Sequence, residues 1–277
     1  MRMRATAAVA ALAGFLALGA LAAPAAQAAT KPPALDLSFG KATVNGGKPV
    51  VVSTGSAKTT VKVTFTAKHG KNVDVFDGSV DMVVGLYRGT DVDNAARNLW
   101  SGGISCAEPS STSLSCTTKI TVPASKLSNA DASTGWKLFL GGIAWNGQNP
   151  DKADDSKIST VEQQKAATAT LQRASKLTVN AAPEPVKKNK TITVTGALTR
   201  ANWDTDKYAG YTKQSVKLQF KKKGTSTYKT LKTVTTDSKG NLRTTTKATA
   251  DGYFRYSFAG TSTTPAVSAA GDYVDVK

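Results

Sequence analysis

The chain has 277 residues, and its 36 lysine and arginine residues against 19 aspartate and glutamate residues give a formal net charge of +17. This length exceeds one typical domain and suits two. The single histidine and the two cysteines supply too few nitrogen and sulfur ligands for a zinc site. The sequence also lacks a Gly-x-Ser-x-Gly motif, which argues against a serine hydrolase of that class.

The first 28 residues predict a cleaved signal peptide. Arg2 and Arg4 precede an Ala- and Leu-rich apolar run over residues 7–26, and residues 26–28 (AQA) have the small-x-small pattern that signal peptidase cuts. Two glycines and a proline interrupt the run, which favours cleavage over a permanent anchor. We therefore expect a protein that begins at Ala29, is secreted or loosely associated with the cell wall, and keeps no integral membrane segment.

Short runs of alternating apolar and polar side chains recur along the remaining chain. In one of them Val61, Val63 and Phe65 alternate with Lys62 and Thr64. Similar runs occupy residues 80–86, 120–122, 136–140, 192–194, 216–220 and 254–258. Side chains alternate between the two faces of a strand, so each run predicts a strand with one buried face. Many such strands at spacings of roughly 8–12 residues predict an all-β protein made of β-sandwiches.

A domain boundary is expected near residues 172–175. Residues 162–172 predict the closing strand of a first domain, although their Gln and Ala content also suits a helix. After the boundary the strand pattern restarts at Lys176. We expect one β-sandwich domain over residues 29–172 and a second over residues 173–277.

Residues 237–240 (DSKG) predict a tight turn between strands. A polar turn with glycine in the last place suits a type I turn followed by a residue at positive φ. A strand-like run over residues 230–236 precedes the turn and a Thr-rich run from Leu242 follows it. We expect these two runs to form a hairpin.

Cys106 and Cys116 are the two cysteines of the chain. Exported proteins fold in an oxidising compartment, where such a pair forms a disulfide. The bond would close the short loop of residues 107–115 and staple a hairpin. A redox-active pair would more often have Cys-x-x-Cys spacing.

Charge divides the two predicted domains. Residues 29–172 carry 15 Lys and Arg against 12 Asp and Glu, whereas residues 173–277 carry 19 against 7, a net charge of +12. In the run over residues 216–220 the apolar side chains face inward, so Lys217 and Lys221 should face outward. The predicted polyanion-binding residues are Lys217, Lys221, Lys222, Lys223, Lys187 and Lys188.

Two interpretations of these lysines remain open. The first is an electrostatic surface for an anionic polymer such as wall teichoic acid, an acidic capsule or extracellular DNA. The second is solubility and protection of strand edges, because exposed lysines block edge-to-edge association. No DNA- or RNA-reading motif is visible, so a sequence-specific nucleic-acid partner is not expected.

Calcium is the metal that the acidic residues favour, since it binds clustered oxygens. Asp151, Asp155 and Glu162 fall at the first, fifth and twelfth positions of a twelve-residue loop, as in an EF-hand. Ala153 and Ser156 depart from that pattern at positions three and six, where Asp or Asn and Gly are usual. The alternative is an acidic surface loop, and we expect no other cofactor.

Catalytic groups are scarce. The only histidine, His69, lies in a Lys-His-Gly-Lys stretch that predicts a solvated turn. Asp74, Asp77 and Asp81 cluster in the sequence, but isolated carboxylates of this kind are usually solvated. We therefore expect a protein that is not an enzyme, with a hydrolase that acts through a pair of Asp side chains as an alternative.

Four tryptophans suggest a carbohydrate-binding module as a further alternative. Trp136 alternates with Leu138 and Leu140 and is expected in the core. Trp145 and Trp203 lie beside Asn and Asp in loop-like surroundings, which would suit exposed aromatic platforms. The other interpretation is burial, because large aromatic side chains are mostly buried in sandwiches.

The second predicted domain resembles a known family of modules. The resemblance lies in residues 177–180 (LTVN), 193–196 (TVTG), 216–220 (VKLQF), 236–241 (TDSKGN) and 252–260 (GYFRYSFAG). These residues resemble the immunoglobulin-like modules of secreted actinobacterial proteins. The resemblance implies an immunoglobulin-like fold and brings no catalytic residues with it.

The layout of the whole chain resembles two-domain exported actinobacterial proteins of unestablished role, some of which are labelled calcium-binding. The first domain is matched by this layout and by residues 145–151 (WNGQNPD). We therefore expect two immunoglobulin-like β-sandwich domains in a secreted, non-enzymatic binding or structural protein of the extracellular space or cell envelope. An anionic envelope polymer is the expected partner, with calcium binding or stabilisation as the alternative.

Overall fold

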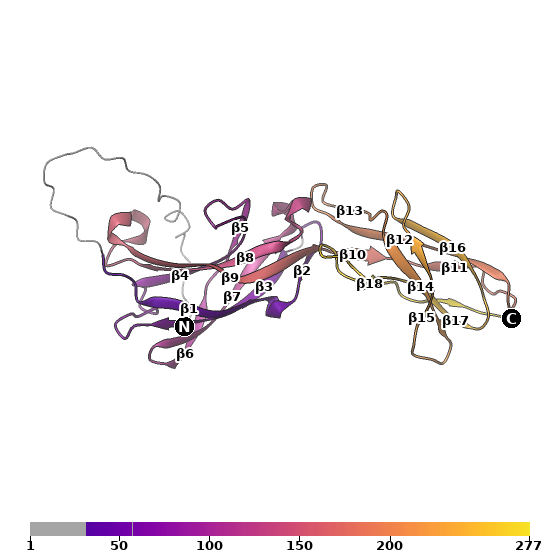
Figure 1. Ribbon diagram of the computed structural model, residues 1–277, viewed down its shortest axis with the longest axis horizontal. Coiled ribbons are helices and arrows are strands. Elements are labelled where there is room, and N and C mark those ends of the chain that lie inside the picture. The colour runs from indigo at the N-terminus through magenta and orange to yellow at the C-terminus, as the bar shows by residue number, and fades with distance from the viewer. Residues whose placement is uncertain (1–31, 57) are drawn as a thin grey trace. The chain divides into compact units, whose positions relative to one another are not determined.

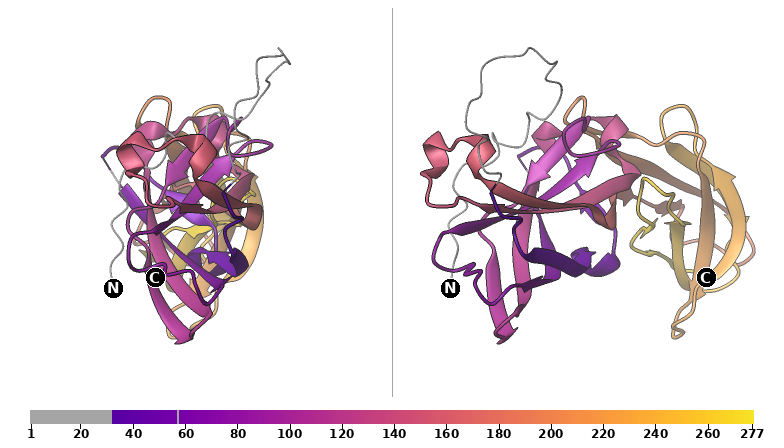
Figure 2. Two further views of the ribbon diagram at one scale, coloured as in Figure 1. Left: turned by 90° about the vertical axis from the view of Figure 1, so that its left-hand side faces the viewer. Right: turned by 60° about the vertical axis from the view of Figure 1, so that its left-hand side comes forward.

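A computed structural model describes residues 32–56 and 58–277, and the predicted signal peptide lies outside these residues. Apart from one-turn 3-10 helices, every element in the described ranges is a strand (Figure 1 and Figure 2). The predicted all-β fold class is therefore confirmed. Within the same ranges, no helix has the length and apolar character needed to span a bilayer.

The first nine strands form the first β-sandwich. They are β1 (Leu37–Val44), β2 (Val50–Val52), β3 (Lys58–His69), β4 (Val80–Arg88), β5 (Arg97–Trp100), β6 (Ser105–Ser110), β7 (Ser113–Pro123), β8 (Ser133–Ala144) and β9 (Ser159–Arg173). One sheet has the order β1-β3-β7-β6, and the other has the order β2-β9-β8-β4-β5. When the strands are lettered A to G in chain order, with β2 as A′ and β5 as C′, the first sheet is A-B-E-D and the second is A′-G-F-C-C′. This is an immunoglobulin arrangement.

The predicted alternation decides which side chains of this sandwich are buried. On β3, Val61, Val63 and Phe65 are buried while Lys62 is exposed. On β8, Trp136 has no exposed surface and neither do Leu138 and Leu140. Full burial of each such side chain contributes roughly 1.5–3 kcal/mol. On β8 the opposite face is covered as well, because Phe139 is also fully buried.

The second β-sandwich consists of ten shorter strands. They are β10 (Ser175–Leu177), β11 (Asn180–Ala182), β12 (Thr191–Asn202), β13 (Lys207–Gly210), β14 (Ser215–Lys222), β15 (Lys229–Thr235), β16 (Asn241–Lys247), β17 (Gly252–Phe258), β18 (Val267–Ser268) and β19 (Asp272–Val274). Strand β12 pairs with β10 and β11 along one edge and with β13 and β16 along the other. The facing sheet has the order β15-β14-β17, and both β18 and β19 pair with β17. With β10 and β11 as strand A, β12 as B and β16 as E, one sheet holds strands A, B and E. The facing sheet holds C′ (β15), C (β14), F (β17) and G (β18 and β19), which is again an immunoglobulin arrangement.

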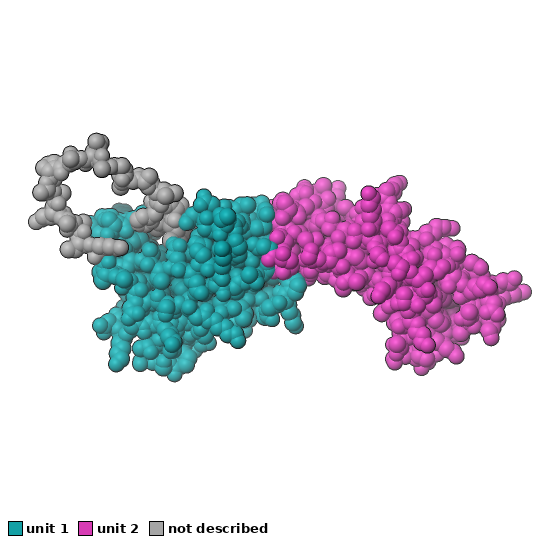
Figure 3. All heavy atoms as spheres, viewed as in Figure 1, with its two compact units in different colours: residues 1–50, 60–122, 135–169 teal, residues 51–59, 123–134, 170–277 magenta. Residues whose placement is uncertain are grey.

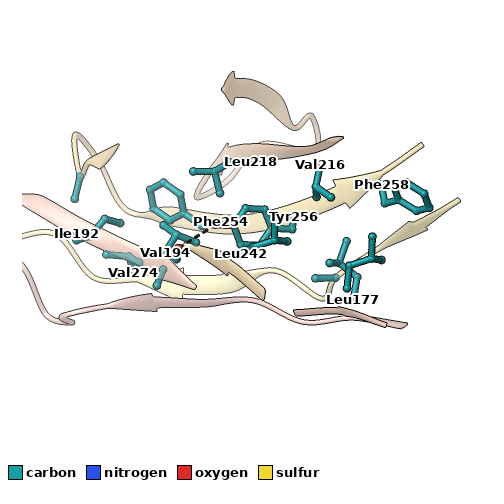
Figure 4. Close-up of a cluster of buried hydrophobic side chains, with 14 of the residues drawn as sticks. Leu177, Ile192, Val194, Val216, Leu218, Leu242, Phe254, Tyr256, Phe258 and Val274 are labelled. Atoms are coloured by element: carbon teal, nitrogen blue, oxygen red, sulfur yellow. Dashed lines mark hydrogen bonds between the residues drawn. The ribbon is translucent and has the colours of Figure 1, made fainter. Parts of the chain in front are cut away.

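Both sheets of the second sandwich contribute to one hydrophobic core (Figure 4). Val194 and Leu242 come from one sheet, and Leu218 and Phe254 come from the other. The buried hydroxyl of Tyr256, on β17, donates a hydrogen bond of 2.9 Å to the carbonyl oxygen of Val194 on β12. This bond links the two sheets through the core.

By its internal contacts the chain divides into two compact units (Figure 3). The described part of unit 1 comprises residues 32–50, Thr60–Val122 and Gly135–Ala169. Unit 2 comprises Val51–Thr59, Pro123–Thr134 and Thr170–Lys277. Unit 2 therefore contains two segments that precede the expected boundary at residue 172 in the chain, and that boundary stays a prediction.

The turn at residues 237–240 forms as predicted, but it does not close a hairpin. Gly240 has φ +83°, and the Asp237 carboxylate accepts hydrogen bonds of 2.8 Å from the backbone N–H groups of Lys239 and Asn241. However, β15 pairs with β14 and β16 pairs with β12, so the turn joins strands of opposite sheets. Local turn chemistry is the same in both cases, which is why the sequence suggested a hairpin.

The predicted disulfide is confirmed. Cys106 on β6 lies directly opposite Cys116 on β7, with 4.1 Å between their α-carbons. The bond joins neighbouring antiparallel strands of one sheet. It differs from the disulfide of antibody domains, which links strands B and F of opposite sheets.

Removing this disulfide should destabilise the first sandwich moderately. The bond closes a loop with a sequence separation of 10, so its loss should lower the free energy of unfolding by roughly 2–3 kcal/mol. We expect that decrease in urea unfolding of a Cys106→Ser/Cys116→Ser double variant. An unchanged midpoint would show that the strand pairing alone holds β6 in place.

Replacing Tyr256 by phenylalanine should destabilise the second sandwich by about 1–2 kcal/mol, because the buried bond to Val194 is lost. Urea unfolding monitored by circular dichroism measures this change. Tyr253→Phe is the matched control, since Tyr253 lies on the same strand with a partly exposed ring. Equal effects of the two substitutions would contradict the assignment.

Stability should also fall steeply above pH 10. Burial raises the pKa of Tyr256 to about 12, above its ordinary value of 10.0. The unfolded chain therefore releases this proton first, and the stability present below pH 10 is lost between pH 10 and 12, at up to about 1.4 kcal/mol per pH unit. Urea unfolding at pH 9, 10 and 11 should show a steeper decline for the native chain than for Tyr256→Phe. Parallel declines would contradict the role of Tyr256.

Candidate polyanion-binding surface

Strand β14 presents its lysines as the alternation predicted. Val216 and Leu218 are fully buried, whereas Lys217 is exposed and Lys221 is half-buried on the outer face. The two lysines are four positions apart along the strand, about 13 Å at 3.3 Å per residue. Lys222, opposite Gly252 at the end of the strand, and Lys223 just beyond it are both exposed.

Beside Lys221 lies an ordered series of cations and tyrosine rings, which we call the cation–tyrosine row. The Arg255 guanidinium carbon is 3.7 Å from the centroid of the Tyr228 ring. The Lys221 ammonium is 5.1 Å from the same centroid and 4.8 Å from that of Tyr253. Tyr253 packs against Tyr273 at 5.2 Å. Lys223 completes the row, 5.5 Å from the Tyr273 centroid.

The pairing of three strands brings these residues together. Lys221 on β14 lies opposite Tyr253 on β17, and Tyr253 lies opposite Tyr273 on β19. Gln219 lies opposite Arg255 and accepts a hydrogen bond of 2.8 Å from its Nε. All of these side chains face away from the core because each is one residue out of phase with a buried neighbour.

One carboxylate lies at the end of the row. Asp251 is 3.6 Å from the Lys223 ammonium and accepts a hydrogen bond of 2.9 Å from the backbone N–H of Val276. That backbone bond is the main reason why the pKa of Asp251 is lowered. Interactions with the Tyr273 hydroxyl and with Asp251 raise the pKa of Lys223, so this lysine is charged at neutral pH.

The second predicted lysine pair reaches the same end of the sandwich. The backbone N–H of Lys188 donates to the carbonyl of Lys277, and the N–H of Lys277 donates to the carbonyl of Val186. Val276, the neighbour of Lys277, is bonded to Asp251, whose carbonyl accepts from the N–H of Lys223. Residues 276 and 277 thus connect the segment that carries Lys187 and Lys188 to the Asp251 end of the row.

The three predicted calcium ligands lie on three different secondary-structure elements. Asp151 lies in a 3-10 turn, η5 (Pro150–Lys152), and Asp155 begins another, η6 (Asp155–Lys157). Glu162 is on β9, where partial desolvation and then the charge of Asp93 raise the pKa of its carboxyl group. In the described ranges no group of three or more His, Cys, Asp or Glu side chains is arranged to hold a metal ion. Calcium binding stays a prediction.

The carboxylates in the sequence around residue 80 have local structural partners. Asp74 and Asp77 accept hydrogen bonds from the backbone N–H groups of Phe76 and Ser79. Asp81 accepts a bond of 3.0 Å from the indole N–H of Trp145, and burial raises its pKa. These contacts explain the positions of the three carboxylates without a catalytic pair.

The prediction for His69 is wrong. It is the last residue of β3 and only 8% exposed, rather than solvated in a turn. Its Nδ1 is 3.1 Å from the carbonyl oxygen of Gly70, and its Nε2 is 3.5 Å from Glu108. The strand continues further than the Lys-His-Gly-Lys stretch suggested because His69 pairs with Leu37 on β1.

The structure contradicts the alternative of exposed tryptophan platforms. Trp145 is 2% exposed and Trp203 is 5% exposed. The Trp203 indole donates a bond of 2.9 Å to the carbonyl of Ser53, which lies in the same compact unit. Trp136 is in the core as predicted, and Trp100 packs edge-on against Phe139. The polar sequence neighbours bond to other groups: Asn146 donates to the carbonyl of Lys157, and Asn202 accepts from the backbone N–H of Asp204. They therefore do not mark an exposed surface.

Neither a protein-family model nor a curated protein matches the chain. Among solved structures, it is similar to the mouse nectin-like molecule 4 ectodomain (Ig1–Ig3), with 12% identity, a TM-score of 0.23 and 85% of this chain covered. The chain spans 64% of the length of that ectodomain. It is likewise similar to titin domains A168–A170, with 12% identity, a TM-score of 0.23 and coverage of 86% of this chain and 68% of the other.

Proposed function

We propose that this protein is a secreted, non-enzymatic binding protein of the extracellular space or cell envelope, and that its second β-sandwich binds an anionic polymer. The gathering of two separate lysine runs at one end of this sandwich carries the proposal. The resemblance of the chain's layout to that of exported actinobacterial proteins agrees with it. The immunoglobulin-like fold serves as a scaffold that holds the charges, in keeping with a binding or structural module.

The basic end has few compensating carboxylates. Its lysines are Lys187, Lys188, Lys190, Lys221, Lys222, Lys223, Lys247 and Lys277. Asp251 pairs with Lys223 at 3.6 Å, and Asp275 pairs with Lys277 at 4.0 Å. The remaining six lysines have no carboxylate partner in the described part of the chain. Such an excess attracts polyanions and releases their counterions on binding, which makes the affinity depend steeply on salt.

Solubility alone would not require this arrangement. Lysines that only keep strand edges apart are expected to be spread over exposed edges. Here Lys190 and Lys247 flank the start of β12, while Lys221 and Lys222 finish β14, so the sandwich places them at one end. Lys207, Lys213 and Lys239 lie at the other end, about 25 Å away along β14.

A triple Lys221/Lys222/Lys223→Ala variant of the full chain should bind poorly to cell walls that carry anionic polymers. We expect an affinity loss of at least about tenfold at low salt, and a slope of log affinity against log salt that is smaller by about 2–3. A Lys207/Lys213/Lys239→Ala variant removes the same charge from the opposite end and is the matched control.

The measurement is a pull-down with isolated walls before and after removal of their anionic polymers, over a salt series. Binding by the native chain should disappear on stripped walls. Equal losses in the two triple variants would show that total charge matters and the basic end does not. An absence of binding at low salt would reject the proposed function.

A further inference from the structure

The cation–tyrosine row is more specific than a cluster of lysines. We infer that Arg255, Lys221 and Lys223, positioned by Tyr228, Tyr253 and Tyr273, form a preorganised site for a phosphodiester polymer that carries no nucleobases. This inference rests on the proposed function and narrows it to a ligand class and to particular cations.

Preorganisation is the first step of the argument. An exposed lysine loses much of its side-chain conformational entropy when a ligand fixes it. Lys221 is already held between the rings of Tyr228 and Tyr253, at 5.1 and 4.8 Å from their centroids. Arg255 is stacked on Tyr228 and bonded through Nε to Gln219, which leaves its other N–H groups available. Less entropy is therefore lost on binding than for free lysines.

Hydrogen-bonding character selects the ligand class. The row offers ammonium and guanidinium groups, which only donate, and phenol groups, which both donate and accept. The acceptor beside it, the Gln219 carbonyl, is occupied by Arg255. Phosphodiester oxygens only accept, and they form strong charge-assisted bonds with arginine and lysine. A hydroxyl-rich acidic polysaccharide also brings many donors, for which the row offers only the phenol oxygens and Asp251, which is already paired with Lys223.

The ring faces argue against nucleic acid as the ligand. Binding of single strands depends on bases that stack on free aromatic faces. Arg255 covers Tyr228 at 3.7 Å, and Tyr253 lies between Lys221 and Tyr273. The rings are engaged in holding cations, so the phosphate backbone is the part of a ligand that the row recognises.

Alternation separates Lys222 from the row. Lys221 faces the rings, whereas Lys222 is the next residue of the same strand and has no ring contact among the described side chains. Both carry one positive charge. If charge alone determined binding, removal of either lysine would lower the affinity equally. The row instead predicts a larger loss when Lys221 is removed.

The test measures binding of the full chain to poly(glycerol phosphate), polygalacturonate and an oligodeoxythymidylate at equal charge concentration. Tyr228→Leu keeps the net charge but releases Lys221 and Arg255, and it should weaken poly(glycerol phosphate) binding about fivefold. Tyr228→Phe keeps the ring and should bind within about twofold of the native chain. Tyr208→Leu is the matched control, because the Tyr208 ring also holds a lysine, with the Lys176 ammonium 3.9 Å from its centroid, but it is not part of the row.

A second comparison does not depend on a tyrosine substitution. Lys221→Ala should weaken poly(glycerol phosphate) binding several-fold more than Lys222→Ala, although both remove one charge. Thermal unfolding of every variant identifies any that fail to fold. If Tyr228→Leu fails to fold, the comparison of Lys221→Ala with Lys222→Ala tests the inference by itself.

Three results would overturn the inference. If Lys221→Ala and Lys222→Ala, or Tyr228→Leu and Tyr208→Leu, lose equal affinity, the row is not the site, but the charge-based function stands. If the oligodeoxythymidylate or polygalacturonate binds more tightly than poly(glycerol phosphate), the ligand class is wrong. If no polymer binds the native chain, both the inference and the proposed function are rejected.

Discussion

Strand β12 is paired along both edges, and the organisation of the second sandwich depends on that pairing. Its two edges hold β10, β11, β13 and β16 in one sheet. The Tyr256 hydroxyl then connects this sheet to β17 by its bond to Val194. Because the core fixes one face of β14 and β17, their opposite face is fixed as well. The same packing that buries Leu218 and Phe254 thus presents Lys221 and Tyr253 outward.

The candidate site is a consequence of sheet register. Residues from β14, β17 and β19 align because Lys221 pairs with Tyr253 and Tyr253 pairs with Tyr273. A shift of one residue in any strand would move its contribution into the core. The site therefore uses no loop architecture beyond the turn that carries Tyr228, and its cations are as well positioned as the strands themselves.

The errors of the sequence interpretation share one physical cause. Trp145 and Trp203 have polar neighbours, yet their indole N–H groups reach Asp81 and the Ser53 carbonyl, which are distant in sequence. His69 is buried because β1 extends alongside it. Residues 237–240 make the expected turn, but the partners of the flanking strands lie elsewhere in the chain. Each error concerns a contact between residues that no local pattern relates.

The all-β class, the strands with their buried faces, the disulfide pair and the outward direction of Lys217 and Lys221 could all be predicted from the sequence. These follow from the two-residue period of a strand and from composition, both of which are local. The sequence could not predict that Tyr228, Tyr253 and Tyr273 meet Lys221, Lys223 and Arg255, or that Lys187 and Lys188 reach the same end of the sandwich. Those juxtapositions depend on strand order and register, which are set by packing between residues far apart in the chain.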